Sequence, residues 1–165
     1  MPISRDIARS YVRPRAVVAE KLAAGRREDR VLAYVMGACL LLFVAQWPVL
    51  ARAAHLEDGP PLDARLGGAL LGWLMIAPLF FYIVAAVIHA LAWVVGGKGT
   101  WFTARLGLFW TLLATTPLML LNGLVSGFFG PGAEQMIVGT LVVLGFFWIW
   151  INAIIVTEGK EAAGV

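Results

Sequence analysis

The feature that most constrains this chain is an uncharged apolar run from Leu66 to Val95. A helix over the whole run would measure about 45 Å, which exceeds the roughly 30 Å of a bilayer's hydrocarbon core. Two separate spans would have only about 15 residues each, too few to cross a bilayer. We therefore predict one long transmembrane helix over residues 66–95, tilted or kinked at Pro78.

Three further apolar segments, residues 31–50, 106–127 and 136–156, bring the expected number of spans to four. Hydrophobic residues make up 61% of the 165-residue chain, above the roughly 45–50% of soluble domains. A soluble chain of this size could not bury so much apolar surface. The expected fold is an all-α, polytopic transmembrane helical bundle, with a basic leader over residues 1–30 and a tail over residues 157–165.

The distribution of basic residues predicts the orientation. Lys and Arg concentrate in the leader, in the loop with Lys98 and Arg105, and in the tail, whereas the opposite side carries only Arg52 and Arg65. Cytoplasmic loops of membrane proteins carry the excess of Lys and Arg. Both termini are therefore expected in the cytoplasm, and the Arg-rich, Ala-rich and Gly-rich composition favours a bacterial inner membrane.

The leader is expected to form short amphipathic helices. Ile3, Ile7 and Tyr11 recur at helical spacing, and Pro14 interrupts the first helix. Its basic residues suit a surface of anionic lipid headgroups. The candidates for this contact are Arg5, Arg9, Arg13 and Arg15. An interfacial anchor and a solvated tail that only sets topology are equal alternatives.

Small residues and prolines inside the spans give candidate positions for packing and bending. Gly-x-x-x-Gly pairs allow two helix backbones to approach closely, and a buried amide is expected to hydrogen-bond to another helix. The packing candidates are Gly68, Gly72, Gly123, Gly127 and Asn122. Prolines remove a backbone donor, so Pro78 and Pro117 are predicted kinks, with Thr115 and Thr116 able to satisfy a freed carbonyl.

The second and third spans are expected to join through a turn at Gly96, Gly97, Lys98 and Gly99, because glycine reaches positive φ without strain. The turn is not a phosphate-binding loop, since Gly follows Lys98 and no strand precedes it. His89 lies close to this turn. An ionisable group in a span is a functional candidate, but a neutral, hydrogen-bonded histidine at the interface is the favoured interpretation.

The spans contain no Ser–His pair, paired carboxylates or His-rich metal motif, so an enzyme is not expected. The single cysteine, Cys39, excludes an internal disulfide and is expected to be a buried, inert thiol. His55, Glu57 and Asp58 lack a recognised metal-site spacing. We therefore expect no metal and no other cofactor, and the clustering of basic residues at the membrane requires no nucleic-acid partner.

Together these features resemble the Yip1 domain family, and most closely its short bacterial members. The resemblance covers about residues 66–121 and consists of Pro78, the segment His89–Ala92, the turn Gly96–Thr100 and Pro117. The leader segments Arg13–Arg15 and Gly25–Arg30 are similar to those of proteobacterial members. Family members commonly have more spans than the four expected here. The resemblance implies a membrane protein without catalytic residues; the eukaryotic relatives are linked to vesicle trafficking and prenylated small GTPases.

The leading hypothesis is a non-enzymatic Yip1-like integral membrane protein that scaffolds partners or organises the bilayer. Its expected partners are the lipid bilayer and either another membrane protein or further copies of this chain. One alternative is an accessory subunit of a larger membrane complex. Another is a component of a small-solute transporter or channel, with His89, Asn122 and the two proline breaks along one path.

Overall fold

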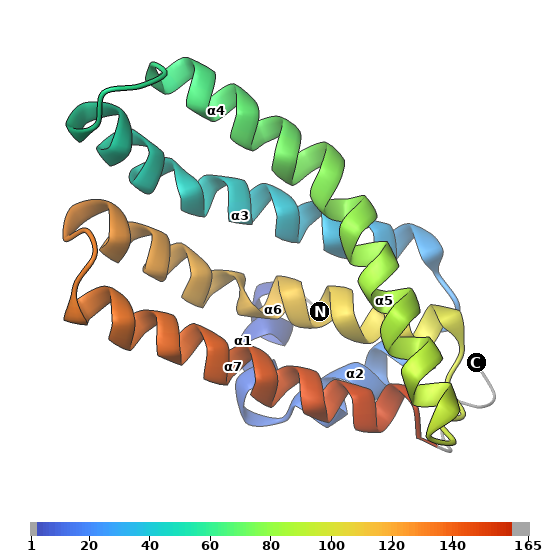
Figure 1. Ribbon diagram of the computed structural model, residues 1–165. Coiled ribbons are helices and arrows are strands. Elements are labelled where there is room, and N and C mark those ends of the chain that lie inside the picture. The colour runs from blue at the N-terminus through green and yellow to red at the C-terminus, as the bar shows by residue number, and fades with distance from the viewer. Residues whose placement is uncertain (1–2, 160–165) are drawn as a thin grey trace.

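A computed structural model describes residues 3–159 of the chain. It confirms the predicted all-α polytopic bundle, because four helices are long and apolar enough to cross a membrane (Figure 1). These candidate spans are Glu28–Leu56, Leu62–Val94, Trp101–Phe128 and Ala133–Thr157. The chain is therefore a multi-pass membrane protein. Three of these helices extend past the predicted apolar run at both ends, since helical structure can continue through the headgroup layer on either side of the hydrocarbon. The second begins before its predicted run and ends within it, at Val94.

The elements follow one another as α1 (Ile3–Val12), α2 (Pro14–Ala23), α3 (Glu28–Leu56), α4 (Leu62–Leu71), a π-helical turn (Gly72–Ile76), α5 (Ala77–Val94), α6 (Trp101–Phe128) and α7 (Ala133–Thr157). Helices α3 and α6 begin at one end of the bundle, and α5 and α7 terminate at the same end. We call this end the basic end. Lys98 and Arg105 lie there, as do the first residues of α3.

The second span is one helical rod made of α4, the π-helical turn and α5. Pro78, at the start of α5, has no backbone N–H, and its ring crowds the carbonyl of Leu74 four residues earlier. The π-helical turn over Gly72–Ile76 widens the backbone just before the proline, which is how helices commonly absorb such a break. Figure 1 shows α4 beside α3, while α5 crosses towards the start of α6.

Helix α6 is the centre of the bundle and packs between α3 and α7. In the most apolar 18-residue window of each span, 56% of the α6 residues are buried but only 11% of those in the second span. The core includes Val35, Cys39, Phe109 and Trp110, all fully buried. Cys39 is a free thiol within this core. The second span therefore presents most of its apolar surface outwards, as a lipid-facing helix does.

The two glycine pairs have different surroundings. A Cβ placed on Gly123 would overlap the carbonyl oxygen of Ala45, and one on Gly127 would overlap Pro48, so both glycines allow α6 to approach α3 closely. Gly68 and Gly72 have no atom within 4 Å of their Cβ positions. The expectation that this second pair packs against another helix is therefore wrong within this chain, because α4 turns that face away from the bundle.

Helix α6 continues through Pro117. The carbonyl left without its helical donor belongs to Leu113, and the Thr116 hydroxyl donates to it at 2.8 Å. The expectation for Asn122 does not hold. Its Oδ1 is buried without a hydrogen-bond partner among residues 3–159, because α7 presents Gly139 there, which offers no side-chain donor.

Candidate functional site

Helices α1 and α2, which we call the leader hairpin, dock against the spans. The Tyr11 hydroxyl donates to the backbone oxygen of Ala114 in α6 at 2.8 Å. Trp148 of α7 donates from Nε1 to the backbone oxygen of Tyr11 at 3.2 Å. Arg15 Nε donates to Asn152 Oδ1 at 2.7 Å. Polar contacts with two different spans thus fix the position of the hairpin.

The local sequence explains the shape of the hairpin. Arg13 has non-helical backbone angles (φ −136°, ψ 62°), in keeping with the bias against the helical region for a residue before proline. Pro14 then starts α2, where a missing N–H costs no helical hydrogen bond. Val17, Val18 and Leu22 recur on one face of α2 and are buried. Burial of this apolar face, in addition to the polar contacts, holds the hairpin on the bundle.

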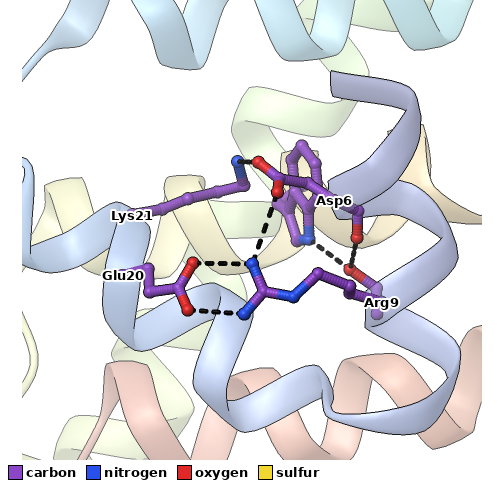
Figure 2. Close-up of polar contacts among 6 residues, drawn as sticks. Asp6, Arg9, Glu20 and Lys21 are labelled. Atoms are coloured by element: carbon purple, nitrogen blue, oxygen red, sulfur yellow. Dashed lines mark hydrogen bonds and ion pairs between the residues drawn. The ribbon is translucent and has the colours of Figure 1, made fainter. Parts of the chain in front are cut away.

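A polar network connects the two helices of the hairpin with α6 (Figure 2). Lys21 Nζ lies 3.0 Å from Asp6 Oδ2, and their side chains are only 11% and 14% exposed. The same ammonium lies 3.7 Å from the ring centroid of Trp110 and 5.4 Å from that of Tyr34. An ammonium over an aromatic face is attracted by the ring quadrupole, more strongly where water is excluded. Lys21 therefore has both an anion and two aromatic rings as partners.

Arg9 extends the network on its outer side. Its guanidinium donates two hydrogen bonds to the Glu20 carboxylate, at 2.6 and 3.0 Å, and lies 3.6 Å from Asp6. The hydrogen bonds from Arg9 lower the pKa of Glu20. Ser10 links the network to α6, because its hydroxyl accepts from Trp110 Nε1 at 3.0 Å and donates to the Asp6 backbone oxygen at 2.8 Å. Burial raises the pKa of Tyr11 nearby.

A cavity of about 610 Å³ separates the leader hairpin from the first turns of α3 and α6. One part of its wall is charged and is formed by Asp6, Glu20, Lys21, Arg27 and Arg30. The other part is apolar and includes Val31, Tyr34, Phe102, Leu106 and Leu113. The cavity therefore combines basic groups at the basic end of the bundle with an apolar wall.

The four arginines expected at the lipid surface divide into two pairs. Arg5 and Arg13 are exposed on the leader hairpin. Arg9 instead hydrogen-bonds to Glu20, and Arg15 to Asn152. Arg15 is nevertheless exposed. The contact of all four arginines with headgroups stays a prediction, and Arg9 and Arg15 have protein partners in addition.

His89 lies at the basic end, where its Nδ1 is 3.3 Å from Glu158 Oε1 at the end of α7. Both side chains are less than 10% exposed, and Trp101 packs edge-on against the imidazole with a centroid distance of 4.6 Å. The hydrogen-bonded histidine is thus present, with a partner that sequence reasoning missed. Asn122 lies in the opposite half of the bundle, so the two residues assigned to one transport path are not brought together.

The turn after α5 holds the end of α7. Gly96 has the positive φ of 92° that the reversal requires. Gly97 and Gly99 serve a close approach instead, since Cβ atoms there would come within 2.9 Å of the Glu158 carboxylate or overlap the Thr157 backbone oxygen. The Lys98 N–H donates to the Glu158 backbone oxygen at 3.0 Å. The turn residues therefore pack closely against the last turn of α7 and hydrogen-bond to it.

Comparisons of the chain with protein-family models, with curated proteins and with solved structures find no match. Between residues 3 and 159, no group of three or more His, Cys, Asp and Glu side chains could hold a metal ion. The fold and the site define a four-span helical membrane protein with a polar leader hairpin docked on two of its spans.

Proposed function

We propose that this protein is a non-enzymatic, Yip1-like membrane protein of the bacterial inner membrane that organises the bilayer around it, with both termini in the cytoplasm. The observation that supports the proposal is the contact of the leader hairpin with the middle of α6, from which we infer its depth in the bilayer. Charged and polar hairpin residues lie beside the middle of α6, where a bilayer would otherwise meet an apolar surface.

The depth follows from the contacts along α6. Arg105 of α6 donates to Glu28 of α3 at 2.7 Å, and such an ion pair belongs at the headgroup level. Ala114, the acceptor of the Tyr11 hydroxyl, lies about 14 Å further along the same helix. That distance is about the thickness of one leaflet's hydrocarbon. The tip of the hairpin at Arg13 therefore reaches the level of the bilayer centre.

Exposed arginine at this depth forces the lipid to adapt. Insertion scales give a cost of about 2.5–3.5 kcal/mol for Arg at the centre of a span, and local thinning and water entry lower the cost. Arg13, exposed at the tip of the hairpin, would draw headgroups and water of the cytoplasmic leaflet inwards. The second span, on the other side of α6, carries no formal charge from Leu66 to Val94 and suits a bilayer of full thickness. The protein would thus impose different thicknesses on its two sides.

The proposed local thinning can be tested by measuring the water accessibility of spin labels at single positions. With Cys39 replaced by Ala, a nitroxide label at Val12→Cys should collide with a water-soluble paramagnetic reagent in anionic vesicles. A label at Leu144→Cys should collide mainly with oxygen. Leu144 is a matched control because it is exposed, and its neighbour Gly145 lies beside the Tyr11 ring.

The same measurement is then repeated after two arginine charges of the hairpin have been removed. In an Arg5→Leu/Arg13→Leu background, water access at position 12 should fall to the value at position 144. Equal access at positions 12 and 144 in the unmodified background would contradict local thinning.

The proposed orientation has its own test. In intact cells, with Cys39 replaced by Ala, cysteines at Glu57 and Gln135 should react with a membrane-impermeant thiol reagent. Glu57 directly follows α3 and Gln135 lies in the first turn of α7, so both positions are at the end of the bundle opposite the basic end. Cysteines at Ser4 and Lys98 should react only after the membrane is permeabilised. Labelling at Lys98 in intact cells would reverse the orientation. The tail residues 160–165 lie outside the described part of the chain.

A further inference from the structure

We propose that the cavity between the leader hairpin and the first turns of α3 and α6 binds one anionic phospholipid. Its phosphate would pair with Arg30, and an acyl chain would lie along the apolar wall. The inference stands on the cavity and its charges, and it does not require the bilayer thinning proposed above.

Among the charged side chains that line the cavity, one basic side chain has no anionic partner in the described part of the chain. Lys21 is paired with Asp6 at 3.0 Å. Arg27 is paired with Asp29 at 2.8 Å. For Arg30, which also lines the cavity, the described part of the chain provides no side-chain hydrogen bond or ion pair. An anion at Arg30 would therefore complete the charge pairing around the cavity, and a phosphate suits the forked donors of a guanidinium.

The position of Arg30 suits a lipid phosphate. It lies in the first turn of α3, next to the Glu28–Arg105 ion pair that marks the headgroup level. The first backbone N–H groups of α3 point towards the same end, and the Arg27 side chain makes no cap hydrogen bond to them. The helix dipole of α3 adds positive potential there, which offsets part of the negative charge of Glu28 and Asp29 in the same turn.

The apolar wall favours a lipid over a soluble phosphate. From Arg30 the cavity extends along α3 to Gly37, about 10 Å deeper in the direction of the bilayer centre. Leu106 and Leu113 of α6 line the same stretch. A volume of about 610 Å³ lies within the usual range for small-molecule sites. Free phosphate would leave this wall unused, whereas a phospholipid would cover it with the first part of an acyl chain.

Native mass spectrometry of the purified protein tests the inference with three probes: a phosphatidylglycerol, a phosphatidylcholine of the same acyl chains, and inorganic phosphate. The unmodified protein should retain one phosphatidylglycerol at a concentration where phosphatidylcholine is not retained. Arg30→Gln should weaken phosphatidylglycerol binding about tenfold, the loss expected for one charge-assisted contact. Ala33→Trp should weaken it comparably by filling the apolar part without changing the charge.

Lys98→Gln is the matched control, because Lys98 is an exposed basic residue at the basic end and does not line the cavity. It should bind phosphatidylglycerol as the unmodified protein does. Equal affinity for the two lipids, or unchanged binding in Arg30→Gln, would overturn the inference. Displacement of the lipid by inorganic phosphate would show a soluble-phosphate site instead. Water access at position 12 is measured separately, so a failure of bilayer thinning is distinguishable from a failure of this site.

Discussion

Replacing Gly123 and Gly127 together by Leu should lower the midpoint of thermal unfolding in detergent by about 10 °C or more. A Cβ at Gly123 would overlap the backbone oxygen of Ala45, and one at Gly127 would overlap Pro48. Because the obstructing atoms belong to the backbone and to a proline ring, α3 and α6 would have to separate along their length. Helices in a membrane associate through such close packing, so its loss has no hydrophobic compensation.

The matched control is Gly68→Leu/Gly72→Leu, the same substitutions at the same spacing in the second span. Nothing lies within 4 Å of either Cβ position, so its midpoint should stay close to that of the unmodified protein. Circular dichroism melts of the two double variants provide the comparison. Equal midpoints would show that α3 and α6 do not pack through these glycines.

Removing the Lys21 charge should release the leader hairpin from the bundle. Lys21→Met would leave the Asp6 carboxylate, whose side chain is 14% exposed, without its ammonium partner. Breaking a mostly buried ion pair from one side costs about 3–5 kcal/mol. When the hairpin separates from the bundle, the Asp6 carboxylate becomes hydrated. The backbone amides of residues 3–23 should then lose their protection from hydrogen exchange. The four spans should keep theirs.

The double variant Lys21→Met/Asp6→Asn should recover much of this protection, because it removes the carboxylate charge that has lost its closest cation. Arg27→Met is the surface control, since Arg27 and Asp29 are both more than half exposed and such pairs contribute little. Hydrogen–deuterium exchange of the leader measures all three proteins. Full protection of residues 3–23 in Lys21→Met would mean that the pair with Asp6 does not hold the hairpin.

The helical bundle was predictable because its signals are local. An apolar run of sufficient length predicts a span whatever surrounds it, and Thr116 lies beside the proline whose freed carbonyl it satisfies. The two glycine pairs mark the limit of such reasoning. Their spacing is identical, but only the pair in α6 faces a neighbour. Which side of a helix meets the bundle depends on where the other helices lie.

The docked hairpin was not predictable for the same reason. The Ser10–Trp110 contact joins residues 100 positions apart in the chain, and the Tyr11–Ala114 contact spans 103 positions. The basic composition of the leader predicts affinity for headgroups, but it carries no information about the pairing of Asp6 and Lys21 beside an aromatic ring. His89 and Glu158 are likewise 69 positions apart.

Docking of the hairpin onto α6 and α7 also determines when the protein can reach its final form during synthesis. The leader leaves the ribosome well before either of the helices that receive it. Until α7 is inserted, Tyr11 and Arg15 lack their contacts with Trp148 and Asn152. Meanwhile its arginines would hold the nascent leader at the anionic membrane surface. The leader hairpin, although translated before all four spans, therefore reaches its final position only when α7 is in place.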